Sequence, residues 1–416
     1  MQNEGSMNGG DGRLNGADFL RASACLIVLA HHLAQRVDPQ SLLGQVPAIQ
    51  VFTSVGGFGV GIFFVLSGFL LSLPFWLALD RGLPLPSLRT YALRRLARIV
   101  PGYWLALSVT FVLSFTVFRF GLDGWLWLRY AAGLLLVSDW HWTTLFPVEI
   151  NGPLWSIGFE ATSYALLPLG FAAIWWLAGR RGGAAGARIA WLGVIGLALA
   201  AHWLFFTLVE VDPVRRGWSY GLQGGAKTWM PWFNPFGFFA MFAAGALAGG
   251  AQTLLARWRH WMFDAIGLAA LAAAGWTIWL HGLRGGGEFY GLLRVPYQFP
   301  HFHLLVGLAL ATLPQSVLAG RLLDNALTRQ LARISFGIYV WHYLILELVR
   351  LHWVPEMEQG TMRDPVKFLV TSGVIAGITM AIATLSWRWL EAPVIAWARG
   401  REVKAPAQGL APAFPR

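Results

Sequence analysis

Two residues of the first apolar stretch, FLRASACLIVLAHHLAQR (19–36), have side chains that could do chemistry inside a membrane. Arg21 and His32 are eleven residues apart, which on an α-helix turns them to within about 20° of one direction and separates them by about 16 Å along the axis. They share one face, whereas His31 points about 80° away from Arg21. Ionisable groups are costly in hydrocarbon and often mark function there. The alternatives are that Arg21 reaches out to the lipid headgroups and that His32 only hydrogen-bonds a neighbouring helix.

The chemistry open to this pair follows from the residue types. A neutral histidine near neutral pH can accept the proton of a hydroxyl group as a general base, or it can carry an acyl group as a nucleophile. The planar guanidinium of Arg21 can neutralise either a phosphate or an oxyanion. Residue type and spacing leave both alternatives open for each side chain.

A cluster of three arginines, Arg94, Arg95 and Arg98, precedes another apolar run. On a helix Arg94 and Arg98 lie one turn apart on one face, with Arg95 beside them. Such a cluster could clamp the phosphates of CoA. It could also do no more than set the orientation of the chain and contact anionic lipids.

One carboxylate is expected inside the membrane. Glu160 lies about seven residues, or roughly 10 Å, inside its apolar run, where an unpaired charge is costly. We expect it to pair with an intramembrane arginine or histidine, such as Arg21, and so to orient a catalytic group. The alternative is a buried hydrogen bond that only secures helix packing.

The composition predicts the setting of these residues. The 416 residues are 56% hydrophobic and 12% charged, against roughly 25% charged in soluble proteins. Lipid is therefore the expected solvent, and the net charge of +11 is attributed to loops that set orientation rather than to a nucleic-acid partner. The single cysteine excludes a disulfide framework. No metal site is predicted, because His301 and His303 diverge by about 200° on a helix.

Ten apolar runs are long enough to cross a membrane. They predict an all-α integral membrane protein with a polar tail at 1–16, a transmembrane domain at 17–397 and a second tail at 398–416. No cleavable signal peptide is expected before the first span. The runs are 17–36, 51–79, 101–118, 153–178, 189–209, 233–254, 262–281, 302–318, 334–353 and 367–397.

Arginine and lysine concentrate in alternate loops, which predicts that both termini face the cytoplasm. A weaker run at 125–138 tests this topology. If it crossed fully, the loop 139–152, which has no Lys or Arg, would be cytoplasmic and the later basic loops would lie outside. We therefore expect 125–138 to be re-entrant or interfacial, on the outer side.

Six stretches of the sequence resemble, in order, motifs of the acyltransferase-3 family of bacterial membrane acyltransferases. In that family an arginine is followed after ten intervening residues by a histidine, a spacing that Arg21 and His32 fit and His31 does not. The proline often found just after the histidine of the late Tyr-x-Trp-His segment is absent after His342. The stretches are LNGADFLRASACLIVLAHH (14–32), FFVLSGFLL (63–71), RRLARIVPGYW (94–104), GPLWSIGFEATSYALLP (152–168), ISFGIYVWHYLIL (334–346) and WRWLEAP (387–393).

The resemblance implies a multi-pass protein of the bacterial inner membrane that transfers an acyl group, usually acetyl, from cytoplasmic acetyl-CoA to a hydroxyl. The extracellular hydrolase-like domain that is fused to some members of the family is not expected here. Tyr339 and Trp341 are expected to be packing residues, and Ser67 fits a close helix approach better than a nucleophile. The residues that it marks are His32, Arg21 and Glu160 for catalysis, Arg94, Arg95 and Arg98 for acyl-CoA, and His342, Trp155, Ser156 and Ser67 as further candidates.

The acceptor stays open at this stage. A cell-envelope glycan, such as an O-antigen or exopolysaccharide, is the first expectation, and a secondary metabolite such as a macrolide is the alternative. A third reading is a non-enzymatic transporter of a lipid-linked sugar. Against it, the sequence shows no paired broken segments in two matching halves.

Overall fold

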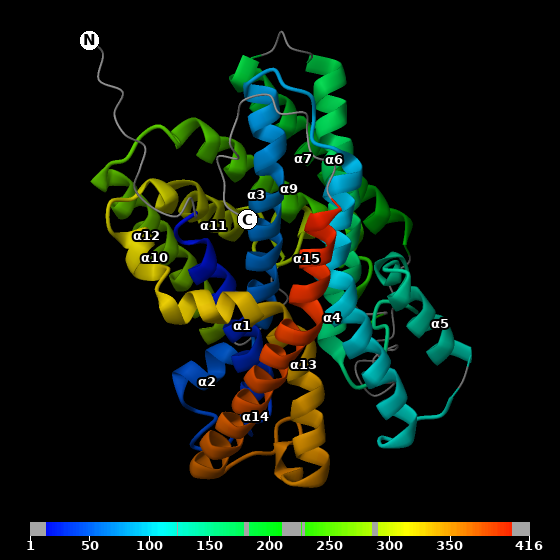
Figure 1. The fold of residues 1–416 in the computed structure, drawn as a ribbon. Helices are drawn as coiled ribbons and strands as arrows, with labels where there is room; N and C mark the ends of the chain where they lie inside the picture. Colours follow the sequence, from blue (N-terminus) through cyan, green and yellow to red (C-terminus); the bar gives the residue numbers. More distant parts are fainter. Residues whose placement is uncertain are drawn as a thin grey trace.

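A computed structural model describes residues 14–122, 124–178, 183–209, 226, 229–284 and 290–401 as a bundle of helices (Figure 1). In this part of the chain, nine stretches are long and apolar enough to cross a membrane. The prediction of an all-α multi-pass membrane protein is confirmed. The long helices are α1 (Ala17–Ala34), α3 (Gly56–Asp80), α4 (Leu88–Thr116), α6 (Ser156–Ala178), α7 (Gly183–Leu208), α9 (Pro235–Leu255), α10 (Trp261–Leu283), α13 (Ala326–His352) and α14 (Pro365–Ser386).

Shorter elements connect or brace these helices. The run predicted not to cross forms α5, whose 11 residues measure about 16 Å against a hydrocarbon core of about 30 Å. The expectation that this run does not cross the membrane as a full span is confirmed, and its place on the outer side stays a prediction. The short α-helices are α2 (Pro47–Phe52), α5 (Gly124–Leu134), α11 (His301–Thr312), α12 (Ala319–Leu323) and α15 (Ala392–Gly400). The 3-10 turns are Ser138–Trp140, Gly152–Trp155, Leu292–Arg294, Leu313–Gln315 and Pro355–Met357, and a π-helix covers Trp387–Glu391.

The eighth predicted span, 302–318, is not a full-length helix. Its α-helix, α11, has 12 residues, or about 18 Å, and passes into the 3-10 turn Leu313–Gln315. Pro314 falls in this turn, and because proline has no backbone N–H it ends the helix there. α11 packs against α3, α9 and α10 inside the bundle. The apolar run 302–318 therefore forms a short, largely buried helix rather than a span.

Two long helices begin well before their apolar runs. α4 starts at Leu88, where the side chain of Ser87 accepts a hydrogen bond from the Thr90 N–H at 3.4 Å. α13 starts at Ala326, where the side chain of Asn325 accepts from two N–H groups of the first turn. These caps extend the helices through the basic segments. The arginines there are therefore held on helices rather than in loops.

The centre of the bundle is the contact between α3 and α9 (Figure 1). Glycines make the close approach possible: a Cβ at Gly68 would lie 1.9 Å from the Phe242 carbonyl oxygen, and one at Gly245 would lie 2.0 Å from that of Val65. Small residues at a helix contact let two backbones meet within a membrane. α1 packs against both α3 and α13, so the Arg21–His32 face can meet α13.

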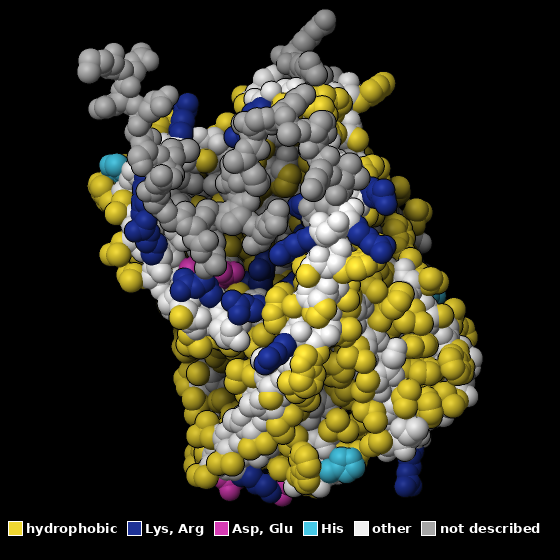
Figure 2. Space-filling view, viewed as in Figure 1, with side chains coloured by type: hydrophobic (Ala, Val, Ile, Leu, Met, Phe, Trp, Pro, Cys, Tyr) yellow, Lys and Arg dark blue, Asp and Glu magenta, His cyan; other side chains and the backbone are white. Residues whose placement is uncertain are grey.

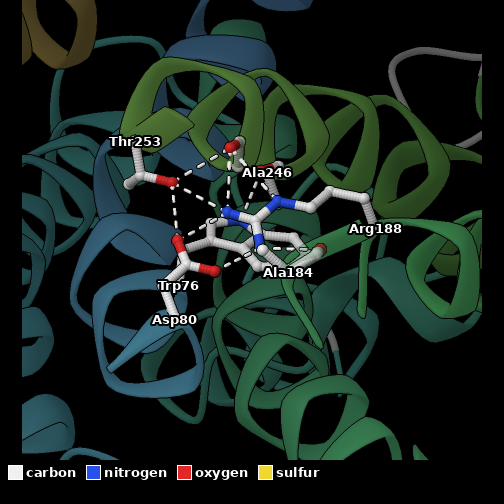
Figure 3. Close-up of polar contacts among 7 residues, drawn as sticks. Trp76, Asp80, Ala184, Arg188, Ala246 and Thr253 are labelled. Atoms are coloured by element: carbon white, nitrogen blue, oxygen red, sulfur yellow. Dashed lines mark hydrogen bonds and ion pairs between the residues drawn. The ribbon is translucent and has the colours of Figure 1, made fainter. Parts of the chain in front are cut away.

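A buried guanidinium ties α7 to this centre (Figure 3). Arg188 forms an ion pair with both carboxylate oxygens of Asp80 on α3, and its Nη2 donates to the Gly250 carbonyl at 3.0 Å and to the Thr253 hydroxyl at 2.8 Å on α9. The central carbon of its guanidinium group, Cζ, also lies 4.5 Å from the ring centroid of Trp76. The guanidinium of Arg188 therefore links α7 to both α3 and α9.

We predict that Arg188→Met lowers the midpoint of thermal unfolding of the purified protein in detergent. Removing one partner of a buried ion pair costs about 3–5 kcal/mol, because the other charge is left uncompensated. The double variant Arg188→Met/Asp80→Asn should recover part of the loss. Arg321→Met, at an exposed position, is the control and should unfold like the wild type. An Arg188→Met protein as stable as the control would show that the contacts of Arg188 do not hold the three helices together.

Candidate active site

An inner cavity of about 100 Å³ lies among α1, α3, α4, α6 and α13. It brings together side chains that the sequence places far apart, and most of its polar groups come from the motifs described above. The polar lining residues are Arg21, Ser67, Arg95, Arg98, Ser156, Glu160, Tyr164, Ser335 and Tyr339. Three guanidinium groups and one carboxylate thus line one small cavity.

Glu160 has partners other than the one that was expected. Its Oε1 accepts hydrogen bonds from the Ser67 hydroxyl, at 3.2 Å, and from the Tyr164 hydroxyl one turn along α6. The ion pair of Arg21 is with Asp18, at 3.9 Å, rather than with Glu160. The carboxylate of Glu160 is therefore stabilised by hydrogen bonds from two hydroxyl groups and by the positive charge of the arginines that line the same cavity.

A second, wider cavity of about 250 Å³ adjoins the first and has a markedly basic lining. We call it the mouth; its lining residues are Asp18, Arg21, Arg98, Arg329, Ala332, Arg333 and Trp387. Arg21 and Arg98 line both cavities, so they stand where the mouth meets the inner cavity. The mouth is at the end of the bundle that the basic segments predict to face the cytoplasm.

Arg98 is held in place by the π-helix that follows α14. Its Nη1 lies 3.6 Å from Oε2 of Glu391, a carboxylate that is 1% exposed and that also accepts from the Ser386 hydroxyl at 3.2 Å. The guanidinium lies over the ring of Trp387, 5.1 Å from its centroid. A π-helix adds a residue to a turn and is often found at functional sites. Here it brings both Trp387 and Glu391 against α4.

The three arginines of the α4 cluster separate in space. Arg95 and Arg98 line the inner cavity, whereas Arg94 is exposed and lies outside the lining of both cavities. Trp155 also lies outside them. It packs in an aromatic cluster with Phe159 and Phe238, at ring-centroid distances of 5.6 Å each, and so shapes α6 rather than the cavity.

One face of α1, which we call the stripe, carries Arg21, Cys25 and His32. At the end of the stripe opposite Arg21, His32 meets His342 of α13. His32 Nδ1 lies 3.0 Å from His342 Nε2. His31 turns away, as the helical geometry predicts, and its Nδ1 lies 2.9 Å from the carbonyl oxygen of Phe52. Cys25, on the same stripe as Arg21 and His32, packs against α13 as well. The stripe therefore lies along α13 over its whole length.

Backbone carbonyl groups determine which nitrogens of this histidine pair carry protons. His342 Nδ1 lies 3.0 Å from the Ile338 carbonyl oxygen and 2.8 Å from that of Tyr339, so it must donate. His342 Nε2 is then an acceptor in the neutral ring. His32 Nδ1 lies 3.0 Å from both this nitrogen and the Val28 carbonyl oxygen, so it carries the proton. The lone pair of His32 is thereby left on Nε2, as a base or nucleophile requires.

Tyr339 connects the inner cavity to the histidine pair. Its hydroxyl reaches the Ser156 hydroxyl at 2.6 Å and the Pro153 carbonyl oxygen at 2.8 Å, while its own carbonyl accepts from His342. Tyr339 is buried in the core, as a packing residue would be, and it also lines the inner cavity. The inner end of the cavity is thus one helical turn from His342.

The start of α1 is bound by the turn between α12 and α13. The carboxylate of Asp324 accepts from the backbone N–H groups of Gly16, at 2.8 Å, and Phe19, at 2.7 Å. A carboxylate at the first turn of a helix satisfies free donors and favours the helix dipole. This contact places Arg21 beside Arg329 and Arg333 in the mouth.

Comparison with known proteins identifies the family of the chain. The sequence profile described as an acyltransferase domain matches residues 14–388. The chain belongs to the acyltransferase-3 family. It is similar to Acyltransferase MdmB of Streptomyces mycarofaciens, with 32% identity over 178 residues, which are 40% of this chain and 43% of that protein. The chain thus spans less than half the length of this relative. No solved structure matches the chain.

Several residues of this candidate site cannot be identified from the sequence alone. Tyr164, by contrast, could have been found, because it is one turn from Glu160 on the same helix. Glu391 belongs to the closing motif, but its contact with Arg98 depends on the π-helix. Arg329 and Arg333 were attributed to loop charge, since the apolar run begins only after them. Spacing alone did not show that α13 begins earlier.

We predict that the inner cavity is open to small reagents through the mouth. In a Cys25→Ala background, which has no other cysteine, Ser67→Cys should react with methanethiosulfonate reagents. The arginines of the mouth should make an anionic reagent react about tenfold faster than a cationic one of similar size.

Ser163→Cys provides the matched control for this experiment. Ser163 lies on α6 near Glu160, but it is fully buried and bonds to the Phe159 carbonyl oxygen, so its cysteine should stay unmodified. Equal reaction of the two cysteines, or a faster reaction with the cationic reagent, would show that the cavity and its charge are not as described.

Proposed function

We propose that this protein is a membrane O-acyltransferase that moves an acyl group, with acetyl as the simplest case, from cytoplasmic acyl-CoA to a hydroxyl of a cell-envelope glycan at the bacterial inner membrane. One observation carries the proposal. A single face of α1 has an arginine-lined cavity at one end and a hydrogen-bonded histidine pair at the other. Membership of the acyltransferase-3 family supports the class of reaction.

The donor suits the charge of the cavities. A CoA thioester has phosphates at one end and its reactive carbonyl at the far end of a long flexible arm. Guanidinium groups bind phosphate through paired N–H donors, and a basic cleft attracts a polyanion. In this proposal Arg21, Arg95 and Arg98 bind the charged part of the donor, and the arm extends past Ser156 and Tyr339 towards His32.

The length of α1 favours one of the two roles that are open for Arg21. About 16 Å of helix separate Arg21 from His32, so the two side chains cannot act on the same atom. We therefore assign Arg21 to a phosphate of the donor and not to the oxyanion formed beside His32. Glu160 offsets part of the positive charge in the cavity and holds Ser67 and Tyr164 in position.

The chemical step uses the lone pair on His32 Nε2. The acceptor hydroxyl attacks the thioester carbonyl carbon while His32 takes its proton, so that a C–O bond forms and the C–S bond breaks. Protonated His32 then returns the proton to the departing sulfur, which leaves as the CoA thiol. His342 Nε2 and the Val28 carbonyl oxygen both accept from His32 Nδ1, so they hold the ring and stabilise its transient positive charge.

We predict that His32→Ala lowers the rate of acetyl transfer from acetyl-CoA by about 10²–10⁴-fold, which is the usual contribution of a general base. CoA release and acetylation of the glycan would be measured with purified protein in nanodiscs. His31→Gln is the control, because His31 lies on another face of α1 and bonds to α2. If His32→Ala kept full activity, the site assignment would be wrong.

Substitutions at His342 test whether it acts through His32. His342→Gln keeps an acceptor for the His32 Nδ1 proton and should retain much more activity than His342→Leu, which has none. The loss in His342→Leu should appear in kcat with little change in KM for acetyl-CoA. Equal loss in the two variants would indicate a packing role for His342.

The acceptor is tested in the cell. The mass of the cell-envelope glycan from a deletion strain should fall short of that of its parent by whole acetyl groups, and expression of the wild-type protein, but not of His32→Ala, should restore it. An unchanged glycan together with an altered secondary metabolite would replace the proposed acceptor by a small molecule. Movement of a lipid-linked sugar without thioester consumption would instead identify a transporter.

A further inference from the structure

Two arginines at the start of α13 line the mouth without belonging to any of the expected sites. Arg329 and Arg333 are four residues apart, so they lie one turn from each other on one face of the helix. Like charges in this arrangement repel each other and destabilise a helix. Two cations placed in this way at a cavity suggest an anion that binds between them.

The charges of the mouth are not balanced by its own lining. Four guanidinium groups, from α1, α4 and α13, face the carboxylate of Asp18 as the sole acid among the lining residues. Asp18 forms an ion pair with Arg21. Glu391, which lies outside the lining, neutralises the charge of Arg98. In the described part of the chain no carboxylate lies within ion-pair distance of Arg329 or Arg333. On this face Figure 2 shows basic side chains gathered around a small acidic patch.

The neighbours of the two side chains leave them free to bind a ligand. Arg329 donates from Nη1 to the backbone carbonyl of Asp324, which fixes its direction while its other N–H donors remain available. Arg333 is exposed at the rim of the mouth. The two therefore lie outside Arg21 and Arg98, which stand at the entrance to the inner cavity.

We infer that Arg329 and Arg333 bind outer phosphate groups at the nucleotide end of the acyl-CoA donor, while Arg21 and Arg98 hold the phosphate nearest to the thioester arm, which passes between them into the inner cavity. The inference rests on the proposed function and assigns the nucleotide to α13 rather than to Arg94 of the α4 cluster. The planar guanidinium suits phosphate, because it offers two parallel N–H groups to two oxygens. A phosphate headgroup of a lipid has the same chemistry, so the test must separate the two sources.

The test compares donors with and without the nucleotide. Wild type, Arg329→Gln, Arg333→Gln and the double variant would be placed in nanodiscs of zwitterionic phosphatidylcholine, and the Kd of CoA would be measured by calorimetry. We expect each substitution to weaken CoA binding about tenfold, since a charge-assisted hydrogen bond contributes roughly this factor or more. KM for acetyl-CoA should rise in parallel, with kcat nearly unchanged. Transfer from acetyl-pantetheine, which lacks the nucleotide, should not change.

Arg321→Gln is the matched control. It removes the same charge from an exposed position on α12, close in sequence to the mouth but outside its lining, and it should bind CoA like the wild type. Because Arg333 is exposed and Arg329 keeps only one backbone contact, the variants should fold, which thermal unfolding would check.

Three results would overturn the inference and leave the proposed function intact. The double variant could bind CoA as tightly as the wild type, transfer from acetyl-pantetheine could fall as much as transfer from acetyl-CoA, or the effect could appear only in nanodiscs that contain anionic phosphatidylglycerol, which would identify a lipid headgroup as the ligand. If the wild type neither bound CoA nor used acetyl-CoA, the proposed function itself would fail.

Discussion

Charged groups inside this bundle must find their partners within the bundle, because lipid offers none. The ion pairs therefore join helices that are distant in the sequence. Arg188 of α7 pairs with Asp80 of α3, and Arg98 of α4 pairs with Glu391 of the π-helix. Near the other end of the stripe, Arg36 pairs with Glu347 of α13 at 2.8 Å. These contacts determine which helices meet, and the site is built where they meet.

The same requirement separates two kinds of arginine. Arg188 is surrounded by acceptors and has no capacity left for a ligand, so it is structural. Arg21, Arg98, Arg329 and Arg333 line a cavity with too little negative charge to balance them. A guanidinium with unmet charge beside open space is suited to an anionic substrate. The distinction comes from the surroundings, since the side chains are chemically identical.

Much of the framework could be predicted from the sequence. Apolar length gave nine of the ten spans, and helical geometry separated His32 from His31. The prediction failed where a pairing depended on packing between helices. Glu160 bonds to Ser67 and Tyr164 rather than to Arg21, since Ser67 of α3 packs against it and Tyr164 lies one turn along its own helix. The contact of His342 with His32 needed the alignment of α1 with α13, and the reach of α13 towards the mouth depended on the cap at Asn325.

The proton positions of the two histidines are set by the main chain of their own helices. The carbonyl groups of Val28, Ile338 and Tyr339 are present whatever side chains occupy those positions. Sequence change in the cavity walls can thus alter which molecules fit while the tautomers stay as they are. In evolution or in engineering, a chain built in this way can acquire new acceptor substrates while the histidine proposed as general base keeps its tautomer.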